Sequence, residues 1–184
     1  KPEAIAELVE GLSIACKENN CALIGGETAE LPGLYKPGEY DLASFLVGVV
    51  EKDKIITGDN IKAGDKVIGL KSTGLQTNGY SLAFKVLLDH AGMKIDDEIE
   101  GLGSTLKEEL MKIHGSYLDA VYPSLDKVKG MAHITGGGLI DNIPRVLPEG
   151  CTVKIYKQAW KVPPIFLLIQ KKGDVPEDDM WRTF

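Results

Sequence analysis

The chain has 184 residues, 43% hydrophobic and 26% charged, with a formal net charge of −6. This is the composition of a globular protein that can bury a core of ordinary size. Its lysines are scattered rather than clustered, so we expect no nucleic-acid partner. No apolar run approaches the roughly 18 residues of a membrane span, so we expect no membrane partner. The three cysteines lack CxxC spacing, which is typical of a cytoplasmic protein in a reducing compartment.

The first third of the chain contains one predicted helix and two predicted strands. Apolar residues recur at helical spacing over residues 3–18. The short apolar segment 21–26 ends in two glycines and predicts a buried strand, and segment 40–52 predicts a longer one. The charged segment that follows has two Gly-Asp turn signals, and these place a domain boundary near Thr57.

Beyond this boundary the predicted elements alternate between strands and helices. Strands are expected at 66–70, 130–135 and 151–156, and helices at 80–90, 104–113, 116–127, 137–147 and 163–173. This alternation predicts an α/β fold, or α+β layers, divided into domains at 1–57 and 58–184.

The sequence AHITGGG places three consecutive glycines between a predicted strand and a predicted helix. Glycine loses more backbone entropy than other residues on folding, so such a run indicates close backbone approach or positive φ. One interpretation is a tight turn that packs the helix; another is an anion bound by the N–H groups of Gly136, Gly137 and Gly138, beside Thr135. His133 is either a satisfied core residue or a group that exchanges a proton near neutral pH. Spacing alone leaves these interpretations open.

Two further motifs place polar side chains directly after predicted strands. In GGETAELPG, Glu27 is either a carboxylate ligand of nucleotide-bound Mg²⁺ or the cap of a turn. In STGLQTNGYSL, Thr77 and Asn78 precede a predicted helix. Local pattern favours Asn78 as the N-cap of that helix, and a polar ligand site is the alternative. The chain contains no P-loop sequence.

Taken in order, GGETAELPG, YDLASFLVGVVEK, STGLQTNGYSL and AHITGGGLIDNIPRVLP resemble the phosphoribosylformylglycinamidine cyclo-ligase (aminoimidazole ribonucleotide synthetase) family. The resemblance implies a two-domain architecture, with 1–57 as the end of an ATP-binding and dimerisation domain and 58–184 as most of a C-terminal domain. It implies ATP-dependent ring closure of formylglycinamidine ribonucleotide in purine biosynthesis, with ATP and Mg²⁺, in a cytoplasmic homodimer. We expect the 184-residue piece alone to be inactive.

The same resemblance assigns roles to individual residues. It implies that His133 and Asn78 are catalytic residues and that Glu27 is the Mg-ATP carboxylate. The expected ATP-binding or substrate-binding residues are Glu27, Thr77, Thr135, Gly136, Gly137 and Gly138.

Three positions depart from the family pattern. Gln76 stands where many members have histidine, which removes acid–base capacity, and Ile113 and Gly115 stand where members of one lineage have proline and arginine. The alternatives are another ATP-using member of the superfamily, such as a formylglycinamidine synthetase or a selenophosphate synthetase, and a non-catalytic dimerising paralogue.

Overall fold

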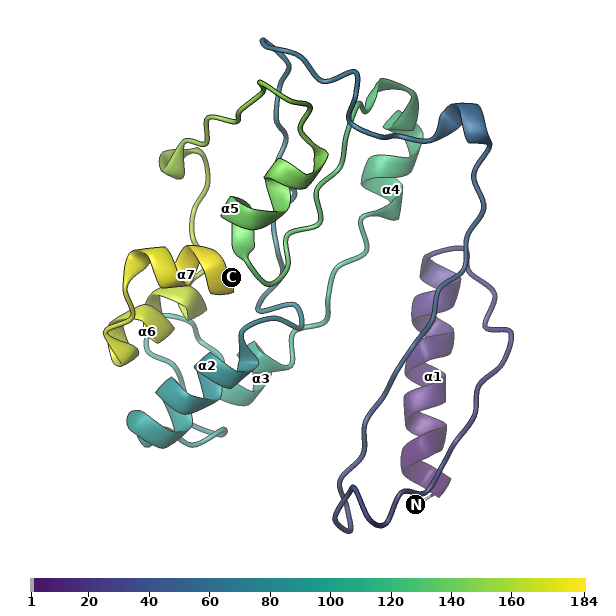
Figure 1. The fold of residues 1–184 in the computed structure, drawn as a ribbon. Helices are drawn as coiled ribbons and strands as arrows, with labels where there is room; N and C mark the ends of the chain where they lie inside the picture. Colours follow the sequence, from purple (N-terminus) through teal and green to yellow (C-terminus); the bar gives the residue numbers. More distant parts are fainter. Residues whose placement is uncertain (1) are drawn as a thin grey trace. The chain divides into compact units, whose positions relative to one another are not determined.

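The computed structural model describes residues 2–184 (Figure 1). These residues form two compact units, the first ending at Ile55 and the second spanning Ile56–Phe184. The division lies beside the boundary predicted near Thr57, and the roles assigned to the two domains stay predictions. No helix formed by the described residues is long and apolar enough to span a membrane.

The first unit contains one long helix, α1 (Pro2–Glu18), which confirms the helix predicted at 3–18. Glu3 lies in its first turn and Lys17 in its last, so both charges are favourable to the helix dipole. The rest of the unit is irregular or extended chain and ends in the 3₁₀ turn η1 (Lys52–Lys54). None of the α1 side chains is buried within the chain.

The predicted strands are wrong for residues 2–184. The segments at 21–26, 40–52, 66–70, 130–135 and 151–156 form no strand, and the sole strand-like pairing among the described residues is one antiparallel bridge, Glu98 with Thr105. In the longest segment Phe45 is 95% exposed and Val49 fully exposed. An apolar pattern shows that a segment suits a sheet, but a strand forms only when another strand satisfies its backbone N–H and C=O groups. The predicted layers of sheet and helix are therefore not formed by the described residues.

Most helices of the second unit lie within the predicted ranges, although most are shorter. The 3₁₀ turn η5 and helix α7 were not predicted. The elements are α2 (Tyr80–Phe84), η2 (Lys85–His90), α3 (Leu106–Leu110), α4 (Leu118–Val121), η3 (Tyr122–Lys127), α5 (Gly138–Asn142), η4 (Ile143–Val146), η5 (Lys157–Ala159), α6 (Pro164–Gly173) and α7 (Glu177–Thr183).

The core of the second unit lies where α2 and η2 pack against α6, with α3 beside them (Figure 1). Its fully buried large side chains are Leu87, Leu106, Ile165 and Ile169. Helix α3 is fixed at its start by a capping box, in which the Thr105 hydroxyl accepts from the Glu108 N–H and the Glu108 carboxylate accepts from the Thr105 N–H. Leu75, which lies in loop 71–79 described below, is one of the buried core side chains.

Helix α6 offers a matched pair of apolar side chains for testing the core. Ile169 is 0% exposed and Leu167 is 52% exposed. We expect Ile169→Ala to lower the free energy of unfolding by about 2–5 kcal/mol, because it leaves a cavity. Leu167→Ala should change it by about 0.5 kcal/mol or less. Denaturant unfolding measures both, and equal losses would contradict this placement of the core.

Candidate functional site

The glycine-rich turn joins the extended segment 130–135 to α5. Gly137 and Gly138 have φ angles of 96° and 62°, in the left-handed region that favours glycine. A Cβ on Gly138 would overlap the main-chain oxygen of Trp181 in α7, and one on Gly137 would lie 2.8 Å from the Asp141 side chain. Positive φ and close approach of α7 to α5 (Figure 1) therefore account for these two glycines.

Two of the three glycine N–H groups already have protein acceptors. The Gly137 N–H donates to the Arg182 carbonyl at 2.9 Å, and the Gly138 N–H donates to the Thr135 carbonyl at 2.8 Å. An anion bound by either group would have to displace these acceptors. Anion binding at the turn therefore stays a prediction, with α7 as the competing partner of Gly137.

A buried amide holds the turn from inside. Asn142 is 3% exposed, and its Nδ2 donates to the carbonyls of Thr135 at 3.1 Å, Gly136 at 3.3 Å and Gly138 at 2.9 Å. Because one NH₂ group carries two hydrogens, the three acceptors share them. Sequence reasoning missed this residue, and the available signal was a polar side chain four residues after Gly138, in a helix that also carries Leu139 and Ile140.

The second loop, residues 71–79, contains two non-glycine residues in left-handed conformation, Gln76 at φ 52° and Thr77 at φ 71°. Such conformations cost free energy and are enriched at functional sites. Thr77 is exposed, and its hydroxyl donates to the Gln76 carbonyl. The loop is thus held in a shape that the local sequence does not favour.

Asn78 does not cap α2, so the capping prediction was wrong. The N-cap is Gly79, at φ 73° and with no side-chain hydrogen bond. The Asn78 Oδ1 instead accepts from the Thr135 Oγ1 at 3.1 Å. This bond joins two predicted motifs 57 residues apart in the chain. The structure therefore brings Asn78 and Thr135 together.

Loop 71–79 is also tied to the segment in which the chain departs from the family pattern. The Gln76 Nε2 donates to the Tyr117 hydroxyl at 2.8 Å, and that hydroxyl donates to the Lys71 carbonyl at 3.0 Å. The Thr73 hydroxyl donates to the Ile113 carbonyl at 2.7 Å. Gln76 therefore has a positioning role in this chain that requires no acid–base chemistry.

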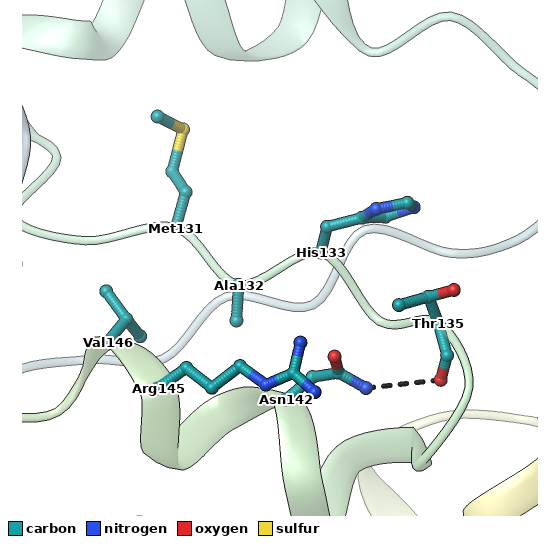
Figure 2. Close-up of a pocket in the computed structure, with 7 residues that line it drawn as sticks. All are labelled: Met131, Ala132, His133, Thr135, Asn142, Arg145 and Val146. Atoms are coloured by element: carbon teal, nitrogen blue, oxygen red, sulfur yellow. Dashed lines mark hydrogen bonds between the residues drawn. The ribbon is translucent and has the colours of Figure 1, made fainter.

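An open pocket of about 320 Å³ lies between the extended segment 131–135 and the helical turns α5 and η4 (Figure 2). His133 is exposed there, so the alternative of a satisfied core histidine is wrong. Figure 2 shows the Arg145 side chain extending from η4 toward the Asn142 end of the pocket. The lining residues are Met131, Ala132, His133, Thr135, Asn142, Arg145 and Val146.

Glu27 lies in the first unit, exposed and in irregular chain. Among residues 2–184 no group of three or more His, Cys, Asp or Glu side chains is placed to hold a metal ion. A nucleotide-bound Mg²⁺ takes one or two carboxylates, with phosphate and water as the other ligands. A lone carboxylate therefore fits as one ligand of a Mg-nucleotide but does not form a metal site by itself.

Two family models match the chain along most of its length. The model described as AIR synthase related protein, C-terminal domain, matches residues 62–184, and the corresponding N-terminal domain model matches residues 1–50. The chain therefore belongs to the AIR synthase related family and has its two-domain architecture.

Curated relatives make the similarity more specific. Proteins named phosphoribosylformylglycinamidine cyclo-ligase from Citrifermentans bemidjiense, Carboxydothermus hydrogenoformans and Acetivibrio thermocellus are 53%, 51% and 53% identical to it. Each match covers the whole chain but 53–54% of the relative. The chain thus spans about half the length of the curated relatives it matches.

The Asn142 amide can be tested by an isosteric change. We expect Asn142→Asp to lower the free energy of unfolding by about 1–3 kcal/mol, because a carboxylate would face three carbonyl oxygens without a donor. Asn60→Asp, at an exposed turn position, is the matched control and should have little effect. Denaturant unfolding of the full-length protein measures both. Unchanged stability of Asn142→Asp would show that the amide does not hold the turn.

Proposed function

We propose that the protein containing this chain catalyses ATP-dependent ring closure of formylglycinamidine ribonucleotide to aminoimidazole ribonucleotide, in purine biosynthesis. The observation that carries the proposal is the match over the whole chain to curated relatives that bear the cyclo-ligase name. The hydrogen bond between Thr135 and Asn78 supports it, because it joins two of the motifs on which the resemblance depends.

The chemistry makes two demands on the protein. ATP transfers its γ-phosphoryl group to the formyl oxygen, a nitrogen of the same substrate attacks the activated carbon, and inorganic phosphate leaves. The substrate must be folded so that nitrogen and carbon meet, which is a proximity effect. The charge of the transferring phosphoryl group must also be stabilised.

Residues of the second unit suit these demands. His133 is exposed at the pocket and can accept or donate a proton during ring closure. Asn78 and Thr135 orient each other through their hydrogen bond, and the NH₂ group of Asn78, which this bond does not use, can bind a polar substrate. We assign Thr77 and the turn Gly136–Gly138 to ligand binding, with the Gly137 N–H released from Arg182 if it binds phosphate.

Glu27 is proposed as the protein carboxylate that binds Mg²⁺ with ATP. The metal would neutralise phosphate charge during phosphoryl transfer. We further propose that the active protein is a cytoplasmic homodimer and that the 184-residue piece alone is inactive.

The test of the function is direct. Purified full-length protein should convert formylglycinamidine ribonucleotide, with ATP and Mg²⁺, to a product with the absorbance of an aminoimidazole, releasing one ADP and one phosphate per turnover. Hydrolysis of ATP without ring closure would favour another ATP-using member of the family. Inactivity toward both substrates, in a protein that folds, would favour a non-catalytic paralogue.

For His133 we expect a loss of turnover without a loss of folding. His133→Ala should lower kcat by about 100-fold or more if the imidazole transfers a proton. Its melting temperature should stay close to that of the parent, because the side chain is exposed. His90→Ala is the matched control, because His90 is exposed like His133 and lies at the end of η2, away from the pocket. A normal kcat in His133→Ala would remove the histidine from the chemistry.

For Glu27 we expect a loss of nucleotide binding. Glu27→Gln replaces a charged Mg²⁺ ligand with a neutral amide and should weaken Mg-ATP binding about tenfold or more. Isothermal titration calorimetry measures this, with Glu30→Gln, three residues along the same irregular segment, as the control. Equal nucleotide affinity in Glu27→Gln and the parent would exclude Glu27 as a metal ligand.

A further inference from the structure

The two arginines of the chain are in different situations. The Arg182 Nη1 is bound to the Asp141 carboxylate at 3.3 and 3.4 Å. Arg145 has no ion pair or hydrogen bond to any residue within 2–184, and it lines the open pocket (Figure 2). A guanidinium stays charged at every physiological pH, so Arg145 brings a permanent, unpaired positive charge to this pocket.

The nearest carboxylate in sequence on the same helical run does not neutralise that charge. Asp141 precedes Arg145 by four residues, a spacing at which opposite charges commonly pair on a helix. Its carboxylate is instead bound to Arg182 of α7. Arg145 is thereby left available to another partner.

The other pocket residues supply no acceptor charge. No carboxylate is among the seven lining residues. The Asn142 amide is committed to the glycine-rich turn, and the Thr135 hydroxyl is committed to Asn78. The remaining polar side chain among these residues is His133, which supplies no carboxylate. A pocket of about 320 Å³ with this lining suits an anionic group.

We propose that Arg145 binds a phosphate group of a substrate in this pocket. A planar guanidinium donates two parallel hydrogen bonds to phosphate oxygens, and such charge-assisted pairs are among the strong ones in proteins. Arg145 is thus a substrate-binding residue to which the motif comparison assigned no role. The inference rests on the proposed function, which supplies two phosphate-bearing substrates, ATP and a ribonucleotide.

The test compares Arg145→Gln and Arg145→Lys with the parent in the full-length protein. Binding of ATP alone and of formylglycinamidine ribonucleotide alone is measured by calorimetry, with melting temperature as the folding control. Lys171→Gln in α6, which contributes nothing to the pocket, removes the same charge elsewhere. We expect Arg145→Gln to weaken one of the two ligands by about 10- to 100-fold, with partial recovery in Arg145→Lys and no change in Lys171→Gln.

The ligand that loses affinity identifies the source of the phosphate. A loss confined to the ribonucleotide assigns the pocket to the ribose phosphate, and a loss confined to ATP assigns it to the nucleotide phosphates. Unchanged affinity for both ligands would overturn the proposal. Equal losses for both, with a lowered melting temperature, would also overturn it, because they would show a structural role. Binding is read without turnover, so an inactive parent that still binds one ligand through Arg145 would refute the proposed function but not this inference.

Discussion

The geometry of the candidate site depends on one buried amide. Asn142 donates to three carbonyls of the glycine-rich turn, and this fixes the path by which the extended segment enters α5. Thr135 at the start of the turn then reaches Asn78, and the first turns after α5 place Arg145 at the pocket. A buried polar network of this kind specifies one backbone arrangement, because an unpaired amide or carbonyl in its place would be costly.

Helix α7 contributes to the same network from the C-terminal end of the chain. Its carbonyl at Arg182 accepts from the Gly137 N–H, and its guanidinium at Arg182 pairs with Asp141. The bond to the Arg182 carbonyl occupies the Gly137 N–H, which a phosphate could otherwise use. The pair with Arg182 occupies the Asp141 carboxylate, which is the nearest in sequence to Arg145 on the same helical run. Exposed ion pairs contribute little to stability, so we expect the Arg182 pair to add little to the free energy of unfolding.

The departures from the family pattern lie where loop 71–79 contacts segment 113–117. Gln76 holds the Tyr117 hydroxyl, and a side chain larger than hydrogen at Gly115 would approach the Thr73 methyl group at 3.3 Å. The loop therefore rests closely on segment 113–117 in this chain. A histidine at position 76 could also make a hydrogen bond, so the glutamine retains that capacity and loses proton transfer.

The sequence by itself determined the helices and the motifs. Helical periodicity is a local property, so α1, α2 with η2, and α6 appear in their predicted ranges, and four ordered motifs identified the family. Tertiary structure alone decided which groups meet. In the structure Asn78 bonds to Thr135 instead of capping α2, and Asn142 donates to the glycine-rich turn. The predicted strands have no partner strands among the described residues. The physical reason is that a helix satisfies the hydrogen bonds of its own backbone. Strands, buried polar networks and pockets need partners distant in sequence, and local pattern does not specify these partners.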